Sequence, residues 1–500
     1  MRGQLGFGAE EAELPASADD IDLPAPRIEP PASLAGICAT DPYERATHSY
    51  GSSYRDLVRA FRARFDHPCD VVAFPRDESE VVSVLDWCNE VRAAAIPYGG
   101  GTGVVGGVEA AIGDGYAGVV TIDLRGLDEV LEVDPVSRAA RIQAGANGPR
   151  LQEQLKEHDF RLRHFPGSFE FSTLGGWIAT RSGGHYATIY THIDDLVESV
   201  RAVTPTGVIE SRRLPGSGAG PSPDRMLMGS EGILGVITEA WVRVQEPPQF
   251  KLSAGIRFGK FTDGVAAVRA LSQSGLYPSN CRLLDPELAA LYGAAGEQGG
   301  AVLVLGFESS HHPVDHWMEL ALQCCADHGG DAAEQSGRDA KGSSDESWRG
   351  GFLREPYVRD LLVSAGVIAE TFETAITWDR FAEFHASVTT AATDAVRSVC
   401  GQGKVGWRFT HVYPDGPAPY YTILAPARRG SELEQWDEIK AAASEALISA
   451  GGTITHHHAV GRDHRPWYDQ QRPERFAAAL SAAKAELDPN RILNPGVLID

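Results

Sequence analysis

Three glycine-rich segments, at 98–107, 166–184 and 229–235, constrain this chain more than any other feature of its sequence. Glycine lets the backbone approach a ligand closely and adopt conformations that other residues avoid. A single loop of this kind is weak evidence for a ligand. Three of them within one β-rich region indicate a long, extended ligand that bare backbone touches at several places, and a dinucleotide has that shape.

The first segment contains a pattern that resembles the fingerprint of NAD-binding Rossmann domains. Gly101-x-Gly103-x-x-Gly106 follows a predicted strand, and Asp123 follows at the spacing of the acidic residue in that fingerprint. The fingerprint requires a helix whose N-terminus meets the pyrophosphate, whereas residues 107–115 are short and interrupted by glycine. A loop whose successive backbone N–H groups face phosphate fits better, and a tight turn without a ligand is the other alternative.

The periodicity around this segment predicts a β-α-β unit. Residues 71–75 and 95–98 read as strands, and Asp77 begins the intervening helix with Glu80 in a capping-box position. Further short, β-branched strands are predicted at 119–124, 130–133, 140–144 and 236–244, and a helix is predicted to begin near Pro149.

The 500-residue length allows two or three domains at roughly 100–200 residues each. Residues 1–64 form an acidic, proline-rich leader, which we expect to be mobile or a surface strap, and an N-terminal helix near Tyr54. Residues 65–248 carry the glycine segments, and Pro247-Pro248 marks a boundary. Residues 249–500 alternate helical and β stretches and form a second large domain.

Charge and cysteine content exclude several classes of partner. The net charge of −23 argues against nucleic acid or an anionic membrane as the main partner. The seven cysteines show no C-x-x-C or zinc spacing, which favours a reducing, cytoplasmic environment. We find no secretory signal and no apolar run long enough for a membrane span.

The glycine segments resemble those of the vanillyl-alcohol-oxidase-type flavoproteins, also called the PCMH-type FAD-binding fold. The matching stretches are 97–107, 167–177, 180–184 and 228–238, and the likeness extends to the closing segment 488–496. It implies an α+β chain in which a PCMH-type (VAO-like) FAD-binding domain of two α/β subdomains precedes an α+β FAD-linked oxidase C-terminal cap domain. No histidine lies in 97–107, so the resemblance implies non-covalent FAD.

The resemblance also implies which residues contact FAD. They are Tyr98, Gly99, Gly100, Gly101, Thr102, Gly103, Val104, Gly167, Ser168, Ser172, Thr173, Gly176, Thr180, Ser182, Gly183, Glu231, Gly232, Gly235 and Ile237.

Within this family, segments 170–177 and 456–461 are most similar to those of the alkylglycerone-phosphate synthases. That similarity implies exchange of the acyl group of acyl-dihydroxyacetone phosphate for a fatty alcohol through a flavin N5 adduct. Gly167 and Ala459 depart from the synthase pattern, which has Asp and Gly there. The alternatives are an FAD-linked dehydrogenase or oxidase of a D-2-hydroxy acid (lactate, glycolate or 2-hydroxyglutarate) and a flavin-fold protein without activity. The expected partner is a lipid or hydroxy-acid substrate, compatible with peripheral membrane contact and a homodimer.

Three consecutive histidines, His456, His457 and His458, are the candidate chemical groups of the second domain. Imidazole binds zinc readily, but residues 453–455 read as a strand, in which only His456 and His458 would share a side. No metal-spaced Cys or carboxylate cluster accompanies them, so we predict no metal. Packing histidines and an acid/base group facing the flavin are the other interpretations.

The resemblance to the synthases assigns three more residues. Arg359 is implied as the clamp for a substrate phosphate or carboxylate, Arg282 as a second required arginine, and Tyr421 as the acid/base tyrosine. Each has a structural alternative: an ion pair with Asp360, an ion pair with Asp285, and a plain strand tyrosine. The register of the tyrosine is uncertain by one residue, so Tyr420 competes with Tyr421.

Overall fold

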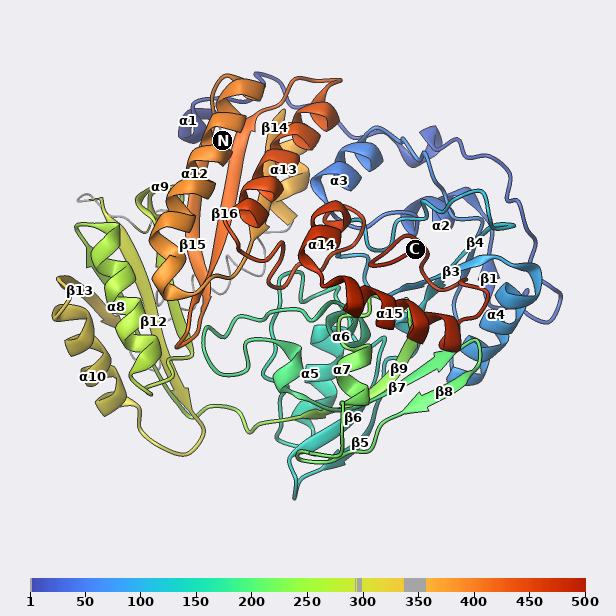
Figure 1. Ribbon diagram of the computed structural model, residues 1–500, viewed down its shortest axis with the longest axis horizontal. Helices are drawn as coiled ribbons and strands as arrows, with labels where there is room; N and C mark the ends of the chain where they lie inside the picture. The colour runs from blue at the N-terminus through green and yellow to red at the C-terminus, as the bar shows by residue number, and fades with distance from the viewer. Residues whose placement is uncertain (1, 293, 295–298, 337–356) are drawn as a thin grey trace.

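The computed structural model describes residues 2–292, 294, 299–336 and 357–500, and the described chain forms three β-sheets (Figure 1). Two sheets belong to the first half of the chain, on the right of Figure 1, and the third belongs to the second half, on the left. This is the α+β arrangement that the sequence predicts, with two subdomains in the first half of the chain and a cap domain in the second half.

The first sheet contains the predicted β-α-β unit, in the strand order β1-β2-β4-β3. Strands β2, β4 and β3 run parallel, and buried aliphatic residues of α4 cover them. Asp77 caps α4 by accepting a hydrogen bond from the N–H of Glu80. Residues 99–118, between β3 and β4, contain no helix, which confirms the argument against a Rossmann site. The elements are β1 Cys38–Ala39, β2 Val71–Ala73, α4 Glu78–Val91, β3 Ala94–Tyr98 and β4 Val119–Asp123.

The second sheet is antiparallel, in the order β5-β6-β9-β7-β8. Its buried face packs with α5 and α6 around a core that includes Trp177 and Leu151. The elements are β5 Val130–Asp134, β6 Ala139–Gln143, α5 Gly148–Lys156, α6 Leu174–Thr180, β7 Val197–Thr204, β8 Gly207–Glu210, α7 Pro223–Leu227 and β9 Val236–Arg243.

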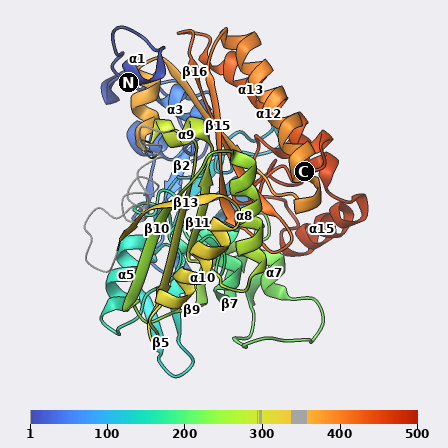
Figure 2. The ribbon, with the colours of Figure 1, turned by 90° about the vertical axis from the view of Figure 1, so that its left-hand side faces the viewer.

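The third sheet has seven antiparallel strands in the order β13-β10-β12-β11-β15-β16-β14. One face packs against α8, α10, α12 and α13, as the two ribbon views show (Figures 1 and 2). The elements are β10 Phe250–Phe258, α8 Phe261–Gln273, β11 Asn280–Leu284, α9 Pro286–Leu291, β12 Ala301–Ser309, α10 Asp315–Ala326, β13 Gly330–Ser336, β14 Val367–Glu373, α12 Trp378–Cys400, β15 Lys404–Val412, β16 Pro417–Pro426 and α13 Glu432–Ser449.

Each end of the chain packs against the half of the molecule that is formed by the other end of the sequence. In the leader, Leu5 and Phe7 are buried in the core of the cap domain, and β1 adds an edge strand to the first sheet. At the other end, Leu493 bridges Ala95 of β3, so the closing segment packs with the FAD-binding half rather than with the cap. The remaining elements are α1 Arg2–Leu5, α2 Pro42–Thr47, α3 Tyr54–Phe61, α14 Arg465–Gln471 and α15 Glu474–Leu487.

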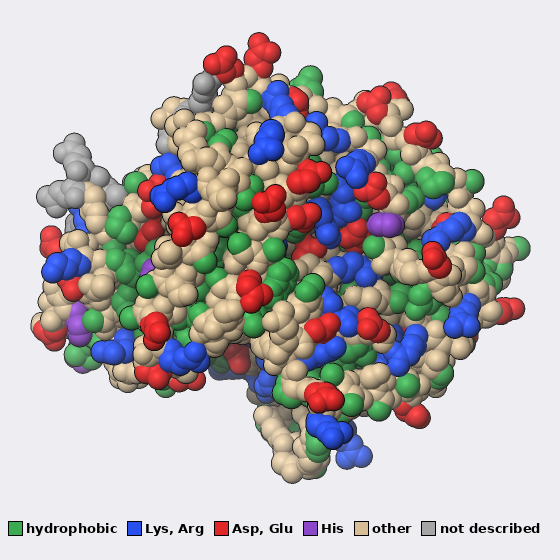
Figure 3. Space-filling model, turned by 45° about the horizontal axis from the view of Figure 1, so that its top comes forward, with side chains coloured by type: hydrophobic (Ala, Val, Ile, Leu, Met, Phe, Trp, Pro, Cys, Tyr) green, Lys and Arg blue, Asp and Glu red, His purple; other side chains and the backbone are tan. Residues whose placement is uncertain are grey.

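The face of the molecule in Figure 3 shows no basic patch. Acidic and basic side chains lie interspersed over that face (Figure 3). None of the helices in the described part of the chain combines the length and hydropathy needed to cross a bilayer.

Candidate active site

A cavity of about 860 Å³ lies between the FAD-binding domain and the cap domain. All of the residues that the sequence resemblance implies as FAD contacts line it. They form one wall, and the opposite wall comes from the cap domain, including Arg359, Arg408 and Tyr420. Three glycine segments that are far apart in the sequence therefore meet on one surface.

The glycines of the first segment are required by close packing against the second segment. A Cβ atom added at Gly100 would lie 2.0 Å from the carbonyl oxygen of Phe171, and one added at Gly99 would lie 2.3 Å from Thr173 Oγ1. Such contacts are far shorter than any van der Waals separation, so larger residues would displace the loop. The wall is thus bare backbone with small hydroxyl side chains, which fits the pyrophosphate and ribityl parts of FAD.

The alternation of β16 decides which tyrosine faces the cavity. Tyr420 lines it, with the guanidinium of Arg408 lying 4.1 Å from its ring centroid. Tyr421 points to the other face of the sheet, where it is fully buried, stacks on Phe372 and bonds to His385 Nδ1 at 3.1 Å. The structure therefore places Tyr420, and not the predicted Tyr421, at the cavity, because neighbours in a strand point to opposite faces.

The three histidines do not follow a strand, contrary to the sequence prediction. Residues 453–455 and the histidines form an irregular segment, so His457 and His458 line the cavity while His456 lies behind it. His458 Nδ1 is buried without a hydrogen-bond partner among the described residues. The ring of His457 stacks near Tyr420, with centroids 6.0 Å apart.

A buried carboxylate that the sequence analysis did not identify holds this turn. Glu373, at the end of β14, accepts hydrogen bonds from the backbone N–H groups of His456 (2.6 Å), His457 (3.1 Å) and His458 (3.0 Å). It also accepts one from the Thr455 hydroxyl at 2.6 Å. One side chain of the cap domain therefore sets the position of the whole histidine run.

A second carboxylate holds the same segment from the FAD-binding domain. Glu231 accepts hydrogen bonds from the N–H groups of Val460 (2.9 Å) and Gly461 (2.8 Å). Burial raises the pKa of Glu231 to about 7, although the two N–H groups lower it. Residues 455–461 are thus held between the two domains by one carboxylate from each.

The histidines are neutral in this setting. Burial, together with nearby His192 and the guanidinium groups of Arg408 and Arg282, lowers the pKa of His457 to about 3. Burial and neighbouring histidines lower the pKa of His456 and His458 well below the ordinary value. The histidines therefore offer lone pairs rather than positive charge at the cavity.

The two predicted arginines lie in different places. Arg359 lines the cavity, and its Nη1 donates to the carbonyl oxygen of Ser52 at 3.0 Å. Arg282 is fully buried behind the wall, where it bonds His185 Nδ1 at 2.9 Å and the His185 carbonyl oxygen at 2.8 Å. Asp285, the ion-pair partner considered for Arg282, caps α9 by accepting a hydrogen bond from the N–H of Leu288.

Arg408 and His411, on β15, were missed by the sequence analysis. Both are fully buried, in the run Trp407–His411. The only signal in the sequence was a charged residue between aromatic residues, Trp407 and Phe409, which is costly to bury unless the charge has a function or a partner. His411, His456 and His457 bring ring nitrogens within 4.8 Å of one another, an arrangement with the geometry to hold a metal ion. The sequence argument considered only Cys and carboxylate ligands and did not identify His411 as a third histidine beside His456 and His457.

Comparison with known proteins identifies both halves of the chain. Residues 69–211 match a family model described as "FAD binding domain", and residues 247–498 match one described as "FAD linked oxidases, C-terminal domain". FAD is therefore the cofactor of this chain, and the chain is an FAD-dependent enzyme.

Individual relatives cover most of the chain. Alkyldihydroxyacetonephosphate synthase of Dictyostelium discoideum is 31% identical over 492 residues, which cover 92% of this chain and 78% of that protein. The mitochondrial D-lactate dehydrogenase (cytochrome) of Arabidopsis thaliana is 27% identical over 86% of this chain and 73% of its own length. A solved alkyldihydroxyacetonephosphate synthase structure superposes with a TM-score of 0.82 at 26% identity, covering 99% of this chain and 91% of that one.

Proposed function

This chain belongs to the FAD-linked oxidase family, and from that premise we propose that it exchanges the acyl group of acyl-dihydroxyacetone phosphate for a fatty alcohol. The observation that carries the proposal is the two-walled cavity, in which glycine loops face Arg359, Tyr420 and His457. The likeness to alkyldihydroxyacetonephosphate synthases over nine-tenths of the chain supports the same reaction.

Each wall has a separate task in this proposal. FAD, when bound against the glycine loops, would supply an electrophilic isoalloxazine ring. Arg359 binds the substrate phosphate, because a guanidinium presents paired donors to phosphate oxygens. Neutral His457 takes the proton from the C1 carbon. The hydroxyl of Tyr420, a residue that is 7% exposed, donates to the departing or entering oxygen.

The second candidate is oxidation of a D-2-hydroxy acid. The D-lactate dehydrogenase relative favours it, and so does a cavity wall in which guanidinium groups adjoin neutral histidines. Here an arginine would bind the carboxylate and His457 would take the hydroxyl proton. The cytoplasmic location, a peripheral membrane contact and a homodimer stay predictions.

Anaerobic mixing separates the two functions. A synthase releases fatty acid from acyl-dihydroxyacetone phosphate when a fatty alcohol is present, with no electron acceptor added. A dehydrogenase instead bleaches its yellow colour with a D-2-hydroxy acid and releases no fatty acid. Bleaching by lactate, glycolate or 2-hydroxyglutarate within turnover time would refute the synthase proposal.

A further inference from the structure

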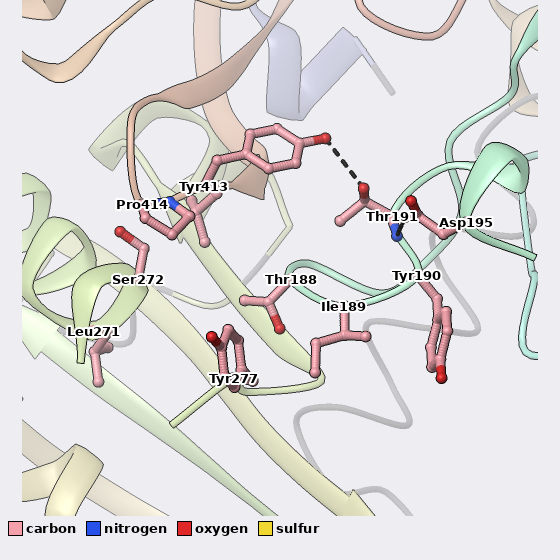
Figure 4. Close-up of a pocket in the computed structure, with 11 residues that line it drawn as sticks. Thr188, Ile189, Tyr190, Thr191, Asp195, Leu271, Ser272, Tyr277, Tyr413 and Pro414 are labelled. Atoms are coloured by element: carbon pink, nitrogen blue, oxygen red, sulfur yellow. Dashed lines mark hydrogen bonds between the residues drawn. The ribbon is translucent and has the colours of Figure 1, made fainter. Parts of the chain in front are cut away.

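A second pocket of about 450 Å³ lies on the far side of the histidines from the FAD cavity. It is lined by the loop 188–191, by the end of α8 and by the turn after β15 (Figure 4). Within it, the hydroxyl of Tyr413 donates to Thr191 Oγ1 at 3.2 Å, the dashed line of Figure 4. Neither residue has a role in the proposed function.

Hydrogen bonds connect this pocket to the FAD cavity without a gap. The Tyr413 hydroxyl oxygen lies 2.8 Å from His456 Nε2, and His456 Nδ1 lies 3.0 Å from His457 Nδ1. His457 lines the FAD cavity, and its Nε2 bonds to no other described residue. The chain therefore ends, at the cavity, on a ring nitrogen that is available to a ligand.

A backbone carbonyl fixes the proton positions along this chain. His192 Nδ1 lies 3.0 Å from the carbonyl oxygen of Arg181, which can only accept, so Nδ1 carries the proton. In the neutral ring, His192 Nε2 is then a lone pair, and His456 Nε2, 3.0 Å away, must donate to it. His456 Nδ1 is consequently an acceptor, and His457 Nδ1 must donate to that nitrogen. His457 Nε2 is left as the lone pair.

We infer that His192 and Tyr413 are positioning residues, which hold His457 in the tautomer with a free Nε2 and carry its proton to the second pocket. This inference rests on the proposed role of His457 as the base. When Nε2 takes a proton from the substrate, Nδ1 passes its own proton to His456 Nδ1. His456 Nε2 then passes a proton to the Tyr413 oxygen, whose hydroxyl proton goes to Thr191 or to water in the pocket. One proton enters, one leaves, and no electron moves.

A metal ion is the competing occupant of the same nitrogens. His411 Nε2 lies 3.1 Å from the carbonyl oxygen of Gly184 and must donate to it, so Nδ1 is a lone pair that is buried without a described partner. A divalent cation held by His411, His456 and His457 would occupy the lone pair of His456 and interrupt the proton chain.

The tautomers are measurable without any turnover. In FAD-loaded protein labelled with ¹⁵N-histidine, two-bond ¹H–¹⁵N correlations distinguish protonated from unprotonated ring nitrogens, and a His457→Asn variant assigns the signals. We expect His457 protonated at Nδ1 and unprotonated at Nε2. A His457 signal protonated at Nε2, or one bound metal ion per chain by elemental analysis, would overturn the inference, whatever substrate the enzyme accepts.

Variants test the two positioning residues. His192→Leu removes the acceptor that orients His456, so we expect mixed His457 tautomers and a kcat lowered about ten-fold at unchanged KM. His192→Gln keeps an acceptor oxygen and should restore both readouts. Tyr413→Phe should leave the tautomer intact and lower kcat with a larger solvent isotope effect. His316→Gln, on an exposed stretch of α10, is the matched control. Unchanged kcat and isotope effect in Tyr413→Phe would refute the proton path.

Discussion

Replacing Glu373 by glutamine tests whether one carboxylate positions the histidine turn. Glu373 is almost fully buried and accepts three backbone N–H groups and one hydroxyl. Glutamine offers one accepting oxygen in place of two, so one or two of these donors lose their partner. A buried donor without a partner costs about 1–3 kcal/mol, which gives a loss of about 2–4 kcal/mol for E373Q.

The functional effect should exceed what destabilisation alone explains. A displacement of about 1 Å in a reacting group costs about 10²-fold in rate, so we expect kcat to fall by that order while FAD is retained. The measurements are urea unfolding of the FAD-loaded protein, the flavin absorbance and steady-state kinetics. Glu153→Gln, whose side chain is 74% exposed, is the control and should stay within about 0.5 kcal/mol. An E373Q protein with the unfolding midpoint and kcat of that control would refute the reasoning.

Three further predictions follow from the same geometry. Tyr420→Phe should lower kcat while leaving the unfolding midpoint unchanged, whereas Tyr421→Phe, which loses a bond to His385, should lower stability by about 1 kcal/mol and leave kcat unchanged. Gly100→Ala should yield colourless protein, because the added Cβ would collide with the carbonyl oxygen of Phe171. Gly103→Ala is the control, since its Cβ would have no protein atom within 4 Å and the variant should fold normally. The flavin absorbance of Gly103→Ala therefore reports on contact with the cofactor alone. Glu231 has a raised pKa in the folded state, so its contribution to stability is present at low pH and is lost as the pH rises through about 7. Relative to E231Q, the wild type should lose up to about 3 kcal/mol of unfolding free energy between pH 5 and 8. Parallel pH profiles of the two proteins in urea unfolding would contradict this.

Local patterns predicted most of the first half of the fold. The strand at Val71–Ala73, the helix capped by Asp77 and the glycine loop after Tyr98 depend on residues that are neighbours in the sequence. The role of the loop glycines was predictable as well, because a residue without a side chain leaves space that any other residue would fill. The grouping of the three glycine segments was also correctly inferred, because a single long ligand explains them together.

The histidine turn was not predictable, because its backbone partners come from distant elements. Residues 453–455 have strand-like composition, but the N–H of Ile454 donates to the side chain of Gln471, and Glu373 takes the next N–H groups. A strand partner is thereby replaced by two side chains that are distant in the sequence. The preference for Tyr421 over Tyr420 was wrong for a related reason. Strand alternation places the two side chains on opposite faces of the sheet, but only the packing of α12 shows which face is the core.

The two carboxylates explain how a chain of net charge −23 builds a cavity for anionic ligands. Glu231 and Glu373 direct their carboxyl oxygens at backbone N–H groups of the histidine segment, whereas Arg359 and Arg408 lie on the cap-domain wall of the cavity. Both guanidinium groups thus lie at the cavity, where a bound phosphate or carboxylate would meet positive charge. Because the carboxylates come from different domains, any movement of the cap against the FAD-binding domain must also move His457. The position of His457, the base of the proposed mechanism, is therefore coupled to the relative position of the two domains.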